Sequence, residues 1–258
     1  MDDVARIIAL DTSVFAIESQ TSERDQVAFL RIQSLVRRMR GRYAYLEIGS
    51  HLGGTLLPHF LDPACESIHS VDPRPPYQPD ERGRVFDYLD NSTARMREQL
   101  AAAVPPGALQ RLTTWEHDAA DIPAHRYGRR FDLALIDGEH TNIAAFSDFV
   151  SILPALERDA CVAFHDANLV LDAIANVERL LRHEGTRHAT LILPDLVAVI
   201  GLRGAAQAVM AELGPHAVDR GAFVAYARRQ LREDIAANAG QNANEHLASA
   251  SESPDVSA

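Results

Sequence analysis

The order of apolar runs along the chain is the feature that most restricts its fold. Short runs that are apolar along their whole length alternate with stretches of helical periodicity, which is typical of a parallel sheet covered by helices on both faces. The predicted strands are 43–49, 67–72, 112–118, 131–137 and 160–166. The predicted helices between and beside them are 21–40, 54–61, 90–103, 141–156 and 169–185.

The last two apolar runs follow a different rule. "HATLIL" and "LVAVIGL" are separated only by Pro194 and Asp195, which leaves no room for a crossover helix. Two strands joined so closely pair as an antiparallel hairpin. We therefore predict an α/β protein with a Rossmann-like doubly wound seven-stranded sheet, mostly parallel with a terminal antiparallel hairpin.

The chain length sets the domain organisation. A chain of 258 residues is long enough for one large α/β domain with a substantial core. We place this domain at 23–235, behind an N-terminal extension at 1–22. The stretch 236–258 is rich in Ala, Asn, Ser and Glu and has few large apolar residues, so we predict a disordered tail.

Charge and composition restrict the partners and the location. With 25 basic and 36 acidic residues the formal charge is -11, which argues against a nucleic-acid partner. No run approaches the roughly 18 apolar residues of a membrane span, and the first residues do not form a secretory signal. Cys65 and Cys161 are expected to be reduced thiols. We expect a cytoplasmic protein.

Polar residues and glycines gather where the predicted strands end. Small ligands of open α/β sheets bind at these carboxyl ends, beside the point where the strand order reverses. The residues there are Glu47 and Gly49, Asp72, His117 and Asp118, Asp137, His165 and Asp166. Their concentration exceeds what a sheet needs for stability, so we predict a ligand site at this edge.

The turn after the first strand suggests the ligand. Its glycines have the spacing G-x-x-x-G-G from Gly49, whereas dinucleotide-binding turns read G-x-G-x-x-G. Glu47 would repel a pyrophosphate but favours the cationic amino-acid end of a ligand, and Asp72 is placed to accept both hydroxyls of a ribose. These features favour a positively charged adenosine ligand. The alternative is a simple tight turn, with Asp72 starting another turn before Pro73.

At this point the chain resembles the class I S-adenosylmethionine-dependent methyltransferases. The resemblance rests on "LEIGSHLGG", "IHSVDP", "WEHDAAD" and the terminal hairpin, and it covers roughly residues 22–203. It implies S-adenosyl-L-methionine as the cofactor. The implied cofactor contacts are Glu47, Gly49, Ser50 and Gly53 at the methionine end, Asp72 at the ribose, Asp118 and Ala119 at the adenine, and Asp137 near the methyl group. For Asp118 a helix cap is the alternative.

A narrower resemblance covers the fourth and fifth strands. "DGEHTN" and "FHDAN" are similar to a subgroup with D-G-x-H-[ST]-Y and H-D segments, although Asn142 stands where that subgroup has an aromatic residue. Several such relatives methylate hydroxyl groups of sugars or small aromatic and natural products with help from a divalent metal. The resemblance therefore implies a small-molecule acceptor, methylated at oxygen.

Transfer to a hydroxyl needs a base or a metal, because a neutral alcohol is a weak nucleophile. His140 is the candidate base and Asp137 its catalytic partner; a cap for the helix from Thr141 is the alternative for His140. Mg²⁺ or another divalent cation is expected at a site formed by Asp137, Asp166 and Asn168. Asn168 could instead cap a helix, and His165 could face the pocket or pack beneath it.

Two segments are left for the acceptor. The long connection 73–100 is expected to line the acceptor pocket or to cover the cofactor, and a contact with a partner subunit in a homo-oligomer is the alternative. The first residues carry the same two alternatives. Two other functions stay open: a non-catalytic cofactor-binding protein of the same fold, and an NAD-dependent oxidoreductase, which the glycine spacing and the hairpin oppose.

Overall fold

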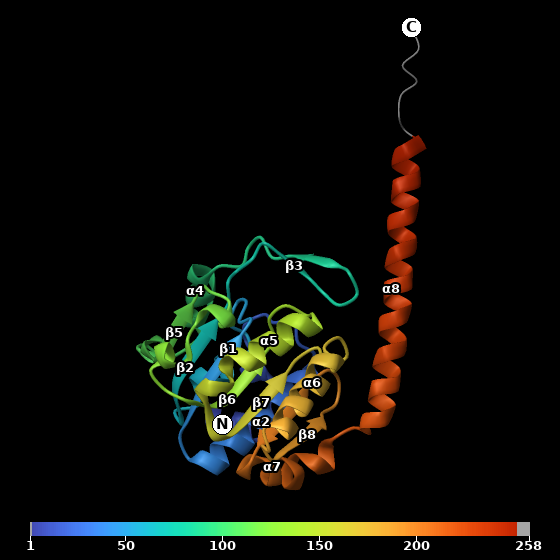
Figure 1. The fold of residues 1–258 in the computed structure, drawn as a ribbon. Coiled ribbons are helices and arrows are strands. Elements are labelled where there is room, and N and C mark those ends of the chain that lie inside the picture. Colours follow the sequence, from blue (N-terminus) through green and yellow to red (C-terminus); the bar gives the residue numbers. More distant parts are fainter. Residues whose placement is uncertain (1, 252–258) are drawn as a thin grey trace.

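A computed structural model describes the backbone of residues 2–251 and the side chains of residues 2–239. Its centre is a seven-stranded sheet with the order β5-β2-β1-β6-β7-β9-β8 (Figure 1). All neighbours pair in parallel except β9, which is antiparallel to both β7 and β8. The strands are β1 (Tyr43–Ile48), β2 (Cys65–Val71), β5 (Leu112–Trp115), β6 (Phe131–Ile136), β7 (Leu156–Phe164), β8 (His188–Ile192) and β9 (Ala198–Leu202). The predicted sheet, including its terminal hairpin, is confirmed.

Helices cover both faces of this sheet. On one face α5 and α6 pack over side chains such as Leu46 and Phe164, and on the other α2, α4 and α7 pack over side chains such as Tyr45 and Leu135. Successive strand residues point to opposite faces, and both faces are apolar because both are buried. The helices are α1 (Asp3–Ile8), α2 (Glu23–Arg40), α3 (Leu57–Leu61), α4 (Thr93–Ala103), α5 (Asn142–Ile152), α6 (Leu171–His183), α7 (Gly204–Ala208) and α8 (Arg220–Ser251).

Short helical turns complete the layers. They are single 3₁₀ turns except for one π turn: η1 (Thr12–Val14), η2 (Ala108–Arg111), η3 (Ala119–Asp121), η4 (Ala124–Tyr127), η5 (Leu153–Ala155), η6 (Val209–Leu213, the π turn) and η7 (Gly214–His216).

The connection between β2 and α4 folds into a small ribbon. Strands β3 (Tyr77–Pro79) and β4 (Val85–Asp87) pair antiparallel and arch over the carboxyl edge of the sheet (Figure 1). The tip of the ribbon reaches α8, where the Asn238 amide donates to the Arg82 carbonyl at 2.8 Å. The ribbon is therefore supported from outside the sheet.

The C-terminal stretch differs from its prediction. Helix α8 continues to Ser251 and projects away from the sheet (Figure 1), where the sequence predicted a disordered tail from residue 236; that disorder stays a prediction. A sequence of Ala, Asn and Glu lacks a core-forming face, but Ala carries the highest helix propensity. Residues 252–258 lie outside the described part. The domain boundaries at 22 and 235 stay predictions. Among residues 2–251, none of the helices combines the length and hydropathy that a membrane span needs.

Candidate active site

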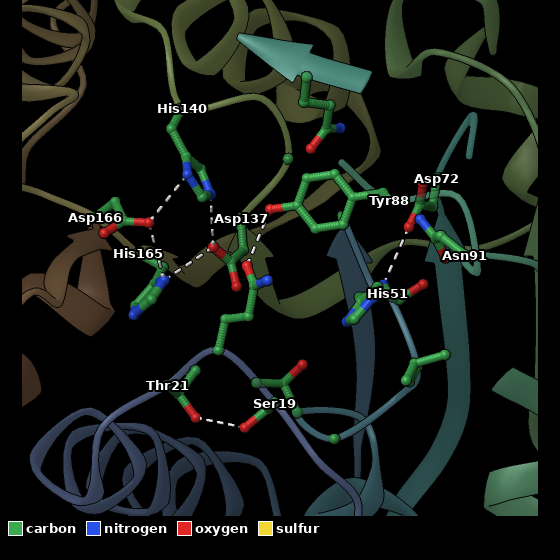
Figure 2. A pocket seen from close by; sticks show the side chains of 18 of the residues that line it. Ser19, Thr21, His51, Asp72, Tyr88, Asn91, Asp137, His140, His165 and Asp166 are labelled. Atoms are coloured by element: carbon green, nitrogen blue, oxygen red, sulfur yellow. Dashed lines mark hydrogen bonds and ion pairs between the residues drawn. The ribbon is translucent and has the colours of Figure 1, made fainter. Parts of the chain in front are cut away.

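The strand order reverses beside β1, and a pocket opens there. Strand β1 lies between β2 and β6, and the connections that follow β1 and β6 lead to β2 and β7, in opposite directions along the sheet. Open α/β sheets bind ligands at such a point. The pocket has about 640 Å³ of space, including the part open to solvent. Its wall contains six of the predicted site residues: Gly49, Ser50, Asp72, Asp137, His140 and Asp166 (Figure 2).

The glycine turn is tightly enclosed. Gly49 has a φ of 83°, and a Cβ on it would lie 2.0 Å from the carbonyl oxygen of Asp137. Gly53 has a φ of 87°, and its Cβ would lie 3.1 Å from Leu100 on α4. A Cβ on Gly54 would lie 2.6 Å from Ser19. Glycine is therefore needed where the turn meets β6, α4 and the N-terminal segment.

Asp72 lies beside this turn, as predicted. Its side chain is 3% exposed at the end of β2. One carboxylate oxygen accepts the backbone N–H of His51 at 3.0 Å, and the other accepts the backbone N–H of Arg74 at 2.9 Å. These two bonds fix the carboxylate toward the glycine turn (Figure 2).

Glu47 lies under the turn, outside the pocket wall. Its side chain is fully buried and accepts hydrogen bonds from Tyr45 at 2.5 Å and from Thr55 at 2.6 Å. Burial raises the pKa of Glu47 to about 8, despite the hydrogen bonds from Thr55 and Tyr45. Glu47 thus reaches the pocket only through Thr55, which does line it. Its predicted contact with the cofactor stays a prediction.

The remaining predicted cofactor residues lie outside the pocket wall. Gly53 holds the turn against α4, as described above. Asp118 is exposed and precedes η3, but its side chain makes no capping hydrogen bond to that turn. Ala119 is 1% exposed and packs in the core. The adenine contact proposed for Asp118 and Ala119 stays a prediction.

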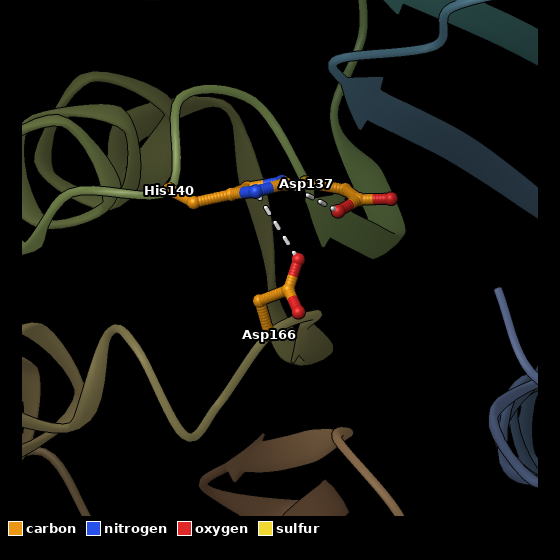
Figure 3. Close-up of side chains that lie close together, drawn as sticks. All are labelled: Asp137, His140 and Asp166. Atoms are coloured by element: carbon orange, nitrogen blue, oxygen red, sulfur yellow. Dashed lines mark ion pairs between the residues drawn. The ribbon is translucent and has the colours of Figure 1, made fainter. Parts of the chain in front are cut away.

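Three ionisable side chains meet at the ends of β6 and β7 (Figure 3). His140 Nδ1 lies 3.2 Å from the Asp166 carboxylate, and His140 Nε2 lies 3.6 Å from that of Asp137. The cap of α5 is Thr141, whose hydroxyl accepts the N–H of Ala144 at 3.2 Å. His140 therefore does not cap this helix, and its imidazole is left to the cluster.

A second histidine extends this cluster into the core. His165 is 5% exposed, and its Nδ1 lies 3.0 Å from Asp137 and 3.5 Å from Asp166. Its Nε2 lies 3.3 Å from the Asp25 carboxylate, in an ion pair without an assigned hydrogen bond. His165 both lines the pocket and packs beneath it, which joins its two predicted alternatives.

Asp25 is the site residue that sequence reasoning missed. It belongs to the capping box of α2, where Ser22 and Asp25 exchange hydrogen bonds. Its other oxygen accepts the N–H of Leu196 from the β8–β9 turn at 2.9 Å. The capping pattern was visible in the sequence, but a contact with a histidine 140 positions away was not.

The charges in this cluster depend on one another. Burial alone would raise the pKa of Asp137, but His165 and His140 outweigh it and lower that pKa to about 2. Burial alone would lower the pKa of His140, but Asp137 and Asp166 outweigh it and raise that pKa above 6.5. The pKa of His165 is raised in the same way, chiefly by Asp137. Both imidazoles therefore favour the protonated form.

The same cluster has the donors for a metal ion. Asp137, His140 and Asp166 each offer a ligand atom, and these atoms lie within 4.8 Å of one another. Asn168 does not line the pocket, and its Oδ1 is buried without a hydrogen-bond partner among the described side chains. Nor does Asn168 cap a helix, because α6 begins at Leu171 without a side-chain cap. His140 is thus a further candidate donor beside the predicted Asp137 and Asp166, and the predicted role of Asn168 as a ligand stays a prediction.

The ribbon and the N-terminal segment close the pocket from above. Gln78, Tyr88 and Asn91 line it from the ribbon side, and Gln20 lines it from the N-terminal segment. Tyr88 donates to the Gln20 side chain at 2.9 Å, so the two segments meet over the pocket (Figure 2). The connection 73–100 therefore lines the pocket, in agreement with the first of the two alternatives predicted for it.

The ribbon is also hydrogen-bonded to the loop between β6 and α5. Glu81 donates its N–H to the His140 carbonyl at 3.0 Å and accepts the N–H of Asn142 at 2.9 Å. The Asn142 side chain in turn accepts from Ala173 at 2.8 Å and donates to the Leu169 carbonyl at 3.3 Å. Asn142, where the resembled subgroup has an aromatic residue, thus ties the loops after β6 and β7 together.

The sheet order and the ligand-binding edge define the class I methyltransferase fold. Residues 46–167, just under half of the chain, match a protein family described as a methyltransferase domain. The chain therefore has the class I methyltransferase fold, and residues 46–167 are similar to a methyltransferase domain, which confirms the resemblance seen in the sequence. The D-G-x-H subgroup is not tested by this match. Comparison with curated protein sequences found no match.

Solved structures agree on the fold. A protein from Staphylococcus aureus assigned as a caffeoyl-CoA O-methyltransferase is 15% identical, with a TM-score of 0.50 over 76% of this chain and 92% of that one. Calicheamicin methyltransferase is 16% identical, with a TM-score of 0.52 over 77% and 91%. The MycE methyltransferase of mycinamycin biosynthesis is 14% identical, with a TM-score of 0.50 over 76% and 54%. Identities this low establish the fold alone.

Proposed function

We propose that the chain transfers a methyl group from S-adenosyl-L-methionine to a hydroxyl oxygen of a small, polar acceptor. The observation that carries this proposal is one pocket with two chemically different ends. The glycine turn and Asp72 form one end, and Asp137, His140 and Asp166 form the other (Figure 2). A cofactor-binding protein without catalysis does not need an acid–base cluster at its second end.

The cofactor would lie along the glycine turn. Its ribose hydroxyls would bind the Asp72 carboxylate, as in other nucleoside sites at the end of a second strand. Its sulfonium would then point toward Asp137, whose backbone touches Gly49. An NAD-dependent oxidoreductase is disfavoured, because the spacing of the turn is not that of a pyrophosphate site.

His140 is the proposed general base. In its neutral form, the imidazole accepts the proton of the acceptor hydroxyl while that oxygen attacks the methyl carbon. The carbon–sulfur bond breaks, its electron pair stays on sulfur, and the sulfonium becomes a neutral thioether. Asp137 and Asp166 then stabilise the imidazolium that forms, because each carboxylate lies within 3.6 Å of a His140 nitrogen.

A divalent cation is the alternative use of the same cluster. Asp137, His140 and Asp166 fit a hydrated cation in number and spacing, and such a cation would lower the pKa of an acceptor hydroxyl. The nitrogen donor suits Mn²⁺ better than Mg²⁺, which prefers oxygen. A neutral imidazole has one lone pair, so His140 cannot be a ligand and a base through the same nitrogen. MycE was solved with Mg, so the cation needs a direct test.

The pocket wall suggests the kind of acceptor. Opposite the glycine turn it carries amide and hydroxyl groups, and Leu52 is its large aliphatic residue. These groups are Ser19, Gln20, Thr21, Gln78, Tyr88 and Asn91. Such groups offer both donors and acceptors, and the Glu18 carboxylate lies beside them in the same wall, which suits a polar hydroxylated molecule better than a flat aromatic one.

Two experiments test the proposal. Isothermal titration with S-adenosylhomocysteine should show binding, and NAD should show none. A screen of hydroxylated metabolites with methyl-labelled cofactor should then transfer label to oxygen. Absence of S-adenosylhomocysteine binding at high micromolar ligand would refute the cofactor. Binding without transfer to any acceptor would support the non-catalytic alternative instead.

A further inference from the structure

Arg74 is paired with Asp72, the carboxylate that is proposed to bind the cofactor's ribose. Its side chain is 7% exposed, and Nη1 lies 3.1 Å from the Asp72 carboxylate. Nη2 donates to Ser50 Oγ at 2.9 Å, and Nη1 donates to the His51 carbonyl. The guanidinium group therefore binds both the ribose carboxylate and the glycine turn.

The hydrogen-bonding capacity of Asp72 shows why this matters. A carboxylate has two oxygens with about two acceptor positions each. The backbone N–H groups of His51 and Arg74 use one position on each oxygen. One position per oxygen remains, which is what the two hydroxyls of a ribose require. The Arg74 guanidinium stands at the same oxygen that accepts from His51.

The guanidinium is not fully satisfied in this place. Its Nε is buried and has no hydrogen-bond partner among the described residues. In water all five N–H groups of an arginine are hydrated. Hydration would therefore replace part of the hydrogen-bond energy that the guanidinium loses when it leaves Asp72. A side chain on a surface connection can also swing out without moving the sheet.

We infer that Arg74 is an internal occupant of the ribose subsite, and that binding of the cofactor displaces its guanidinium from Asp72. This inference rests on the proposed function, since it takes the cofactor to be an adenosine compound. Because Arg74 also donates to the Asn91 side chain at 2.5 Å, its release loosens the end of the ribbon connection as the cofactor enters. Arg74 thus links occupancy of the cofactor subsite to the covering of the acceptor subsite.

The test compares S-adenosylhomocysteine binding by the wild type, R74A and R97A. A site that is self-occupied nine times in ten binds its ligand about tenfold more weakly, so R74A should lower the Kd by about tenfold. R97A removes the same charge from an exposed position on α4 and should leave the Kd unchanged. R74Q keeps a polar side chain of similar length and should also lower the Kd. It takes the place of R74A if R74A is poorly folded.

The ribose can be tested separately. Adenosine should gain from R74A as S-adenosylhomocysteine does, whereas 2′,3′-dideoxyadenosine, which lacks both hydroxyls, should gain much less. The inference is wrong if the wild type binds S-adenosylhomocysteine and both Arg74 variants bind it equally or more weakly. Arg74 would then hold Asp72 in place for the ligand, and the proposed function would stand. If no form binds it, the proposed function fails and takes this inference with it.

Discussion

His165 Nδ1 lies 3.0 Å from the Asp137 carboxylate, in the buried part of the cluster formed by Asp137, His140 and Asp166. On its other side the same ring faces Asp25. The imidazole therefore stands between two carboxylates that come from different layers of the fold. Its removal would leave both of them facing each other without a cation between.

The first prediction concerns this buried histidine. H165F should lower the free energy of unfolding by about 3–5 kcal/mol, because Asp25 would keep its charge in the core without a cationic partner. Urea denaturation monitored by circular dichroism measures the change. D25N in the H165F background should recover much of the loss, since the unpaired charge is then gone. A double mutant that loses the sum of the two single losses would contradict the ion pair.

Glu47 gives a prediction about pH. Its pKa is 4.5 in an unfolded chain and about 8 in the fold, where burial favours the protonated form. The folded protein thus holds a proton that the unfolded one releases, and this contribution is fully present below 4.5 and lost as the pH rises to about 8. Stability should fall by about 1.4 kcal/mol per pH unit inside that window.

The variant E47Q isolates this effect, because its amide does not ionise. The melting temperature should change less with pH between pH 5 and 8 in E47Q than in the wild type. E98Q changes an exposed carboxylate on α4 and should keep the slope of the wild type. Equal slopes in all three proteins would show that Glu47 stays ionised in the fold.

The sequence could predict the sheet and the strand-end residues because both depend on local patterns. Apolar runs end where the chain leaves the core, so Asp72, Asp137 and Asp166 could be placed at one edge without coordinates. Asp25 and Arg74 could not be placed, because their contacts depend on how α2 and the ribbon connection pack. The approach of His140 to Asp137 and Asp166 through both ring nitrogens could not be predicted for a related reason, because it depends on the conformation of the loop after β6.

Gly49 tests the turn itself. G49A should destabilise the protein by more than the roughly 1–2 kcal/mol that left-handed backbone costs a residue with a Cβ, since the Cβ would also lie 2.0 Å from the Asp137 carbonyl oxygen. Gly41 has a similar φ of 72° and open space around its Cβ position. G41A therefore measures the backbone cost alone, and equal losses in the two variants would contradict the close approach of β1 and β6.

His140 provides the test of the base. H140A should reduce turnover by about 10²–10⁴-fold, with the Kd for S-adenosylhomocysteine unchanged, because the imidazole acts on the acceptor proton. Turnover by the wild type should rise as the pH rises through the His140 pKa, which lies above 6.5, since the base works when neutral. This rise should be absent in H140A. Unchanged turnover in H140A would remove His140 from the mechanism.

Chelation decides between the two uses of the cluster. If His140 is the base and no cation takes part, turnover should survive dialysis against EDTA, and D166N should lower it only moderately, because one carboxylate still faces the imidazole. Loss of turnover in EDTA, with recovery in Mn²⁺ or Mg²⁺, would instead assign His140 as a ligand. The two outcomes also differ in the D166N protein. A cation site that loses one of its three protein ligands should need a much higher Mn²⁺ concentration for half-maximal turnover, whereas a base mechanism should show no dependence on Mn²⁺.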